Sequence, residues 1–147
     1  GFFEADIAML PALALFVPLI TATGGNVGIQ SSSIIIQTLS SNAVIFENFS
    51  KRLFKLIMVG FLNALIISAL VFTFTYLFRQ DLKLSTVVSV ALFSVVMLAS
   101  LMGTLTPMLL DKLGVNPAVA AGPFITTAND LLGLAIYFGV AHMLYDL

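Results

Sequence analysis

The chain has 147 residues, of which 60% are hydrophobic and 9% are charged, whereas soluble domains have about 25% charged residues. A water-soluble fold of this size cannot hide so much apolar surface, so we expect an integral membrane protein. Six basic and seven acidic residues without a basic patch argue against nucleic-acid binding, and the absence of cysteine excludes disulfides and thiolate metal sites.

Four long apolar runs predict four transmembrane helices, at about residues 7–39, 53–78, 84–110 and 117–145. Each run provides the roughly 20 residues that a spanning helix needs, and none alternates between apolar and polar residues as a membrane strand does. The predicted fold class is all-α: residues 1–147 form a single transmembrane domain, a polytopic bundle of four helices in the lipid bilayer.

The first run contains a polar stretch, residues 21–33, with three glycines, an asparagine, a glutamine and several hydroxyl groups. Glycine permits an unwound backbone or the close approach of a neighbouring chain, and unwound backbone at membrane depth must face protein or water. If the helix continues, one face carries Thr21, Gly25, Ile29 and Ser33, with Gly28 and Ser32 beside it. We expect a pathway-lining role for this stretch; tight packing through its glycines is the alternative.

The second run carries a stripe of small residues at four-residue spacing, formed by Gly60, Ala64 and Ser68. Small side chains on one helix face allow close contact between helices in lipid. We therefore expect this stripe to be a packing surface and not a ligand site.

Basic residues are concentrated in the connections between the runs. The first and third connections carry four of them, Lys51, Arg52, Lys55 and Lys112, and the second carries two, Arg79 and Lys83. Because cytoplasmic loops are enriched in Lys and Arg, we expect the first and third connections in the cytoplasm, with both chain ends and the second connection outside. Gly114 fits the end of the third helix, and Asn116 followed by Pro117 fits the start of the fourth.

The last run contains Asp130, the only charged residue between Leu113 and Tyr145. A carboxylate near the centre of a membrane helix costs roughly 2.5–3.5 kcal/mol on insertion scales, and the sequence offers no basic partner at this depth. The default hypothesis is that Asp130 faces a polar pathway and handles cations. The alternative is a structural aspartate that bonds to neighbouring helices during assembly.

Oxygen ligands surround Asp130 on its predicted helix. Thr126, Asp130 and Gly133 share one face, and Thr127 and Tyr137 lie at its edges. Pro123 removes a backbone donor and so frees the carbonyl one turn before it, that of Val119. Such hard ligands suit Mg²⁺ or Ca²⁺. One carboxylate is too few for a fully dehydrated ion, but Mg²⁺ sheds water reluctantly, so one carboxylate can hold a mostly hydrated ion. An enzyme is not expected, because the sequence shows no nucleophile–base pair and no cluster of metal ligands.

Two stretches resemble the signatures of one family. Thr23–Gln30 is similar to the T-G-G-N-x-G-x-Q signature of the MgtE family of magnesium channels, and residues 121–138 resemble the last helix of that family, which carries its essential pore aspartate. The pair Phe3–Glu4 looks like the F-E pair before the family's second helix. The resemblance covers the chain almost from end to end, with the motifs in the right order and spacing.

The resemblance implies a homodimeric channel of the bacterial inner membrane, with the pore at the dimer interface and Asp130 holding hydrated Mg²⁺. The other implied pore-lining or ion-contacting residues are Gly25, Asn26, Ile29, Ser33, Gly122, Thr126 and Thr127. It also implies that one upstream transmembrane helix and the cytosolic N and CBS domains, which sense Mg²⁺ in bacterial members, are missing from this sequence.

Two positions depart from the family's pattern. Ile29 and Gly122 stand where some members have a polar Asn near the ion. Both changes remove ligands, so passage of other divalent cations is a live alternative to strict Mg²⁺ selection. A carrier coupled to protons or Na⁺ and a non-conducting membrane assembly module also remain open.

Overall fold

The structure is a computed structural model that describes residues 11–41, 49–120 and 122–145. In order, it contains α2 (Val17–Ser40), α3 (Phe49–Arg79), α4 (Leu82–Lys112), the short 3₁₀ helix η2 (Pro117–Ala120) and α5 (Pro123–Tyr145). The all-α prediction is confirmed. Phe3–Glu4 and the predicted start of the first run at Ile7 lie outside the described residues.

The long helices suit a bilayer. Within the described part of the chain, four helical spans are long and apolar enough to cross a membrane: Pro11–Ser40, Leu53–Arg79, Leu82–Lys112 and Pro123–Tyr145. α3 and α4 have 31 residues each, or about 46 Å of helix at 1.5 Å per residue. They exceed the hydrocarbon thickness of about 30 Å, which tilted helices accommodate.

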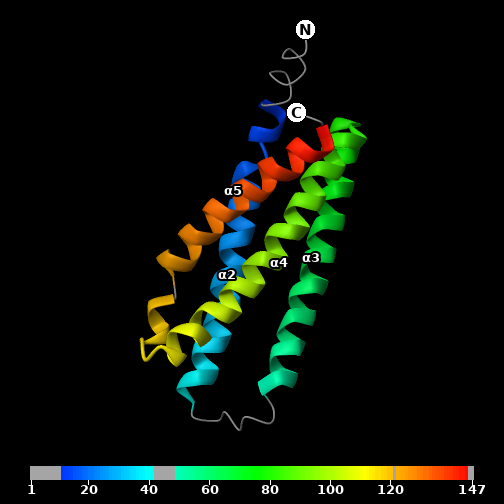
Figure 1. The fold of residues 1–147 in the computed structure, drawn as a ribbon. Helices are drawn as coiled ribbons and strands as arrows, with labels where there is room; N and C mark the ends of the chain where they lie inside the picture. The colour runs from blue at the N-terminus through cyan, green and yellow to red at the C-terminus, as the bar shows by residue number, and fades with distance from the viewer. Residues whose placement is uncertain (1–10, 42–48, 121, 146–147) are drawn as a thin grey trace.

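α4 is the central helix of the bundle. It packs against α2, α3 and α5, while α2 and α5 also pack against each other (Figure 1). The buried apolar residues of α4, from Leu84 to Ala99, form much of the core. α3 lies on one flank and leaves much of its apolar surface exposed, as expected of a helix that faces lipid.

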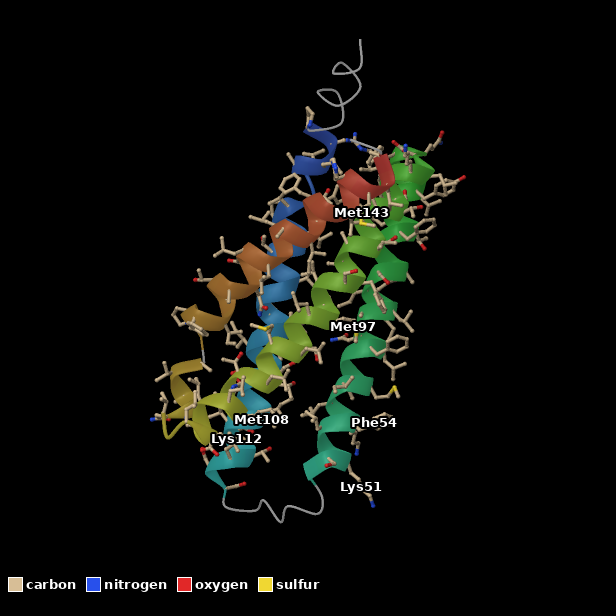
Figure 2. All side chains as sticks on the ribbon, in the orientation of Figure 1. Lys51, Phe54, Met97, Met108, Lys112 and Met143 are labelled. Carbon is tan, nitrogen blue, oxygen red and sulfur yellow. The ribbon has the colours of Figure 1, made fainter. Side chains whose placement is uncertain are left out.

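The ends of the helices fall into two groups (Figure 1). The start of α2, the end of α5 and the junction of α3 with α4 lie at one end, and the end of α2, the start of α3 and η2 lie at the other. Lys51 and Lys112 lie at this second end (Figure 2). The described residues on either side of the first connection thus lie at the same end as the third connection, as the predicted topology requires.

The polar stretch at residues 21–33 is helical throughout, inside α2. Of the two conformations left open by the sequence, the structure has the continuous helix. The chain turns earlier, at Leu15 and Phe16, directly before Pro18 in the first turn of α2. Before this turn, the carbonyl of Leu13 accepts a 2.8 Å hydrogen bond from the buried hydroxyl of Tyr137, which ties α5 to the segment that precedes α2.

The last predicted segment differs from one continuous helix. α4 ends before Gly114 (φ +73°), and Asn116 accepts a 3.0 Å hydrogen bond from the backbone N–H of Ala118 at the start of η2. Gly122 also has a positive φ, +70°, and α5 begins only at Pro123. The physical reason is local: proline tolerates the first position of a helix but not its interior, and glycine adopts the left-handed turn before it.

The small-residue stripe of α3 is buried. Ala64 is fully enclosed, and Gly60 and Ser68 are buried with it. The Cα of Gly60 lies so close to Ser100 of α4 that a Cβ there would overlap the serine hydroxyl. The absence of a side chain at Gly60 therefore permits α3 to approach α4 this closely.

Candidate functional site

Asp130 lies in the second turn of α5, is half-buried, and faces α2. A methyl group built on Gly25 of α2 would lie 3.7 Å from Oδ1 of Asp130 and 3.3 Å from Cγ2 of Thr126. The structure thus brings together three of the residues that the sequence singled out. They come from two helices that are distant in the chain.

The depth of this contact follows from its neighbours. Gly25 is near the middle of the span Pro11–Ser40, and the adjacent Gly24 packs on Val95, near the middle of α4, with 2.8 Å between Cγ1 of Val95 and a Cβ built at residue 24. Asp130 is therefore near mid-membrane. A carboxylate at this depth is costly unless a partner, water or a cation compensates it.

Val95 is also what fixes the spacing of three helices around the site. Its Cγ1 would lie 3.4 Å from a Cβ on Gly133, which is one turn beyond Asp130 on α5. The branched side chain of Val95 is thus inserted between Gly24 of α2 and Gly133 of α5. Small residues allow this close packing in lipid, where van der Waals contact contributes much of helix association.

Thr126 turns its methyl group toward Gly25 and its hydroxyl away. The hydroxyl donates a 3.1 Å hydrogen bond to the carbonyl of Gly122, and that carbonyl also accepts the backbone N–H of Thr126 at 3.1 Å. A carbonyl oxygen has two lone pairs, so both are engaged in this conformation. The carboxylate of Asp130 remains the strongest oxygen ligand at this level of α5.

The remaining predicted pore residues occupy the outer side of α2 and α5. Asn26 and Thr127 are exposed, and Ile29 and Ser33 are half-buried. Gln30, also exposed, continues the polar surface of α2. Exposed amides and hydroxyls in the middle of membrane helices are unfavourable against lipid, so this face calls for water or another protein surface.

Ser32 connects η2 to α2. Its buried hydroxyl donates to the carbonyl of Ala120 at 3.5 Å, and Ala120 is itself fully buried. This contact holds the chain that precedes the Gly122 turn against α2, and so helps to place the start of α5.

Asn129, directly before Asp130 on α5, was not among the site residues predicted from the sequence. It is 2% exposed and its Nδ2 has no hydrogen-bond partner among the described residues. Nδ2 lies so close to Gly28 of α2 that a Cβ on this glycine would overlap it. The sequence shows this amide directly beside Asp130, the only carboxylate of α5, and that position could have drawn attention to it. Its contact with Gly28 is visible only once α2 and α5 are packed together.

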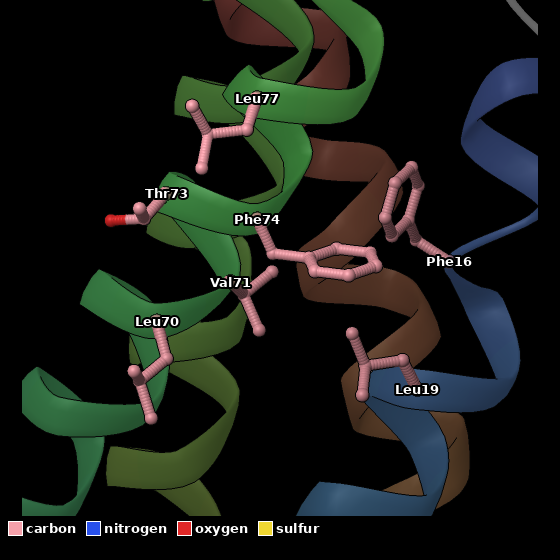
Figure 3. Close-up of a pocket in the computed structure, with 7 residues that line it drawn as sticks. All are labelled: Phe16, Leu19, Leu70, Val71, Thr73, Phe74 and Leu77. Atoms are coloured by element: carbon pink, nitrogen blue, oxygen red, sulfur yellow. The ribbon is translucent and has the colours of Figure 1, made fainter.

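A cavity of about 580 Å³ lies elsewhere, between the start of α2 and the last third of α3 (Figure 3). Phe74 points across it toward Phe16 and Leu19, and the one lining hydroxyl, of Thr73, donates to its own helix at the carbonyl of Ala69. These apolar walls offer no ligand to a cation. This cavity is therefore not the ion site.

Within the described residues, no three His, Asp or Glu side chains come together as a metal-ligand cluster. The donor set around Asp130 is one carboxylate with neutral groups nearby. Such a set suits an ion that keeps its own water ligands and is held through them, as Mg²⁺ commonly is.

Comparisons with known proteins match most of the chain to one family. A family model, MgtE, described as a divalent cation transporter, matches residues 17–140. The chain is similar to three proteins named magnesium transporter MgtE: it is 35% identical over 141 residues to that of Enterococcus faecalis, 34% over 141 residues to that of Bacillus subtilis, and 37% over 144 residues to that of Thermus thermophilus. These matches cover 96%, 96% and 98% of the chain but 31%, 31% and 32% of the relatives, so the chain spans about a third of their length.

Proposed function

The chain belongs to the MgtE family of divalent cation transporters, and on that premise we propose that it is the membrane part of a channel that conducts Mg²⁺ across the bacterial plasma membrane. The pathway runs along α2 and α5, and Asp130 holds the ion with most of its water shell in place. The names of the relatives make Mg²⁺ the first ion to consider. Its reluctance to lose water suits a site with a single carboxylate.

The observation that carries the proposal is the position of Asp130. The carboxylate is near mid-membrane, beside Gly25, and only half-buried. Neither α2 nor α5 contains a Lys or Arg, and the basic residues of α3 and α4 lie near the ends of those helices. A hydrated cation is the compensating charge that this arrangement favours.

The absence of a side chain at Gly25 supports the same reading. Without a side chain at Gly25, no group of this residue stands against Oδ1 of Asp130, where a methyl group would come to 3.7 Å. A hydrated divalent ion brings its water ligands past the carboxylate, so a side chain added at residue 25 would compete with those waters for contact with Oδ1.

A homodimer completes the pathway in this proposal. One copy exposes Asn26, Gln30 and Thr127 on the surface of α2 and α5. A second copy facing this surface would enclose these polar side chains and place two Asp130 carboxylates across one axis. Two carboxylates balance the charge of one divalent cation, which a single copy cannot do.

The test is Mg²⁺ flux into liposomes that contain the full-length protein, measured with a Mg²⁺-sensitive dye. Asp130→Asn removes the charge and keeps the shape, and Asp111→Asn is the matched control, because Asp111 is exposed at the end of α4. A unit charge acting over about 4 Å contributes roughly 1–4 kcal/mol at effective dielectric constants between those of water and a protein surface. We expect Asp130→Asn to reduce flux about tenfold or more and Asp111→Asn to retain it.

Equal flux in the wild type and Asp130→Asn, at matched amounts of dimer, would overturn the assignment of the carboxylate. Flux that saturates and requires a proton or Na⁺ gradient would replace the channel by a carrier. If neither the wild type nor either variant conducts Mg²⁺, and Asp130→Asn no longer forms a dimer, then Asp130 would instead have a structural role in a membrane assembly module.

A further inference from the structure

We propose that Asn129 is a positioning residue for the ion site: its side chain occupies the notch at Gly28 of α2 and so fixes the register at which Asp130 faces Gly25, which in turn sets selection among divalent cations. The inference rests on the proposed function, because it assigns a role relative to the Asp130 ion site. It concerns a different residue and a different contact.

The contact between Asn129 of α5 and Gly28 of α2 is close because residue 28 has no side chain. Nδ2 of Asn129 lies so close to Gly28 that a Cβ at residue 28 would overlap it, and Cγ of the same side chain is 3.2 Å from that Cβ position. Ile125, one turn earlier on α5, is 2.8 Å from it through Cγ2. α5 therefore packs directly against Gly28, and any larger residue at position 28 would displace Asn129.

The same glycine is also held from the other side. Its carbonyl oxygen points at Gly103 of α4, so closely that a Cβ on Gly103 would overlap it. Gly28 is thus fixed between α4 and α5. Because α4 packs against Gly28, the position on α2 that Asn129 contacts is held in place.

Packing alone does not explain an asparagine here. Nδ2 is fully enclosed and has no acceptor among the described residues, and an unpaired buried N–H destabilises a folded protein. An apolar side chain of similar volume would fill the notch without that penalty. Polar groups retained at such a cost are characteristic of sites where geometry matters more than stability.

The relation to Asp130 follows from helix geometry. Successive residues on a helix are about 100° apart, so Asn129 pointing into the bundle directs the side chain of Asp130 to the edge of α5 beside Gly25. Two contacts, Gly28 with Asn129 and Gly25 with Asp130, together define how α5 lies on α2. Loss of the first frees α5 to rotate or slide, which changes the space in front of the carboxylate.

The first test measures the register without transport. The sequence contains no cysteine, and a Cβ at residue 25 lies 3.3 Å from Cγ2 of Thr126, close enough for the pair Gly25→Cys and Thr126→Cys to form a disulfide. In the full-length protein, freed of any other cysteine, we expect oxidation to cross-link this pair efficiently. The yield should fall in Asn129→Ala and stay at the parent level in the control Gly139→Ala, because a Cβ at residue 139 of α5 meets nothing within 4 Å.

The second test measures selection. Without the cysteine pair, Asn129→Ala and Gly28→Ala should each change the ratio of Mg²⁺ to Mn²⁺ flux in liposomes by about threefold or more, and the control Gly139→Ala should leave the ratio at the native value. A residue that only contributes packing would change protein yield and thermal stability but leave this ratio unchanged.

Unchanged cross-linking in Asn129→Ala would overturn the positioning role. Reduced cross-linking with an unchanged flux ratio would overturn the link to selection. If cross-linking behaves as expected while Asp130→Asn retains full flux, the register stands and it is the proposed ion site that fails.

Discussion

Gly25 of α2 lies directly against Asp130 of α5, so that a single added methyl group would come within 3.7 Å of the carboxylate oxygen Oδ1. The pair joins the glycine-rich stretch of the first span to the only charged residue of the last span. It lies near mid-membrane, where Gly24 packs on Val95 of the central helix.

Gly25→Ala should slow Mg²⁺ flux while leaving the protein folded. The new methyl group would lie 3.3 Å from Cγ2 of Thr126, which requires only a small shift, but it enters the space in front of Asp130. We expect a barrier raised by roughly 1–2 kcal/mol, about five- to thirtyfold in rate. Gly139→Ala is the matched control, because nothing lies within 4 Å of a Cβ at that position of α5. Equal flux in the two variants would refute this role of Gly25.

Gly24→Ala should destabilise the bundle, and Val95→Ala should partly rescue it. A Cβ at residue 24 lies 2.8 Å from Cγ1 of Val95, so the alanine forces α2 away from α4 at a cost of about 1–3 kcal/mol. Removing the branched side chain of Val95 makes room for the methyl group. Thermal unfolding in detergent is the measurement. A double variant less stable than Gly24→Ala alone would contradict this packing.

Tyr137→Phe should lower stability without changing ion selection. The tyrosine is fully buried and donates its hydroxyl to the carbonyl of Leu13 at 2.8 Å; its loss should cost about 1–2 kcal/mol. Tyr76→Phe is the control, since Tyr76 is 46% exposed on α3. The melting temperature should fall for Tyr137→Phe only, and the Mg²⁺ to Mn²⁺ flux ratio should stay constant in both. Equal melting temperatures would show that the bond contributes nothing.

Gly122→Asn should be tolerated better than Gly122→Ala. Space is not the constraint, because nothing lies within 4 Å of a Cβ there, but φ is +70°. Alanine in this left-handed conformation costs about 1–2 kcal/mol, whereas asparagine adopts it more readily. The asparagine also adds an amide one turn before Thr126, so half-saturation of Mg²⁺ flux should shift to lower concentration. A less stable Gly122→Asn than Gly122→Ala would contradict the backbone explanation.

The sequence was informative about the helices because hydropathy and end signals are local. The runs at residues 53–78 and 84–110 lie inside α3 and α4, and Gly114 ends α4 with the positive φ that suits glycine. The same local signals left the conformation of residues 21–33 undecided, because glycines suit both an unwound backbone and a packed helix. Neighbours on α4 and α5 decide in favour of the helix.

The site was predictable in part. Asp130 stands out in the sequence because an isolated charge in an apolar run is costly, and helical spacing places Thr126 beside it. Which residue of α2 faces the carboxylate depends on how two distant helices pack, and periodicity along one helix does not determine that. For the same reason, the contact between Asn129 and Gly28 appears only in the folded chain.

The most direct test of the central claim is a structure of the full-length protein with Mn²⁺ as an anomalously scattering substitute for Mg²⁺. We predict one anomalous peak on a twofold axis, between two Asp130 carboxylates, at roughly 4–5 Å from their oxygens, as expected when water ligands intervene. A dimer in which the two Asp130 side chains lie apart from the axis, with no peak near either, would contradict it.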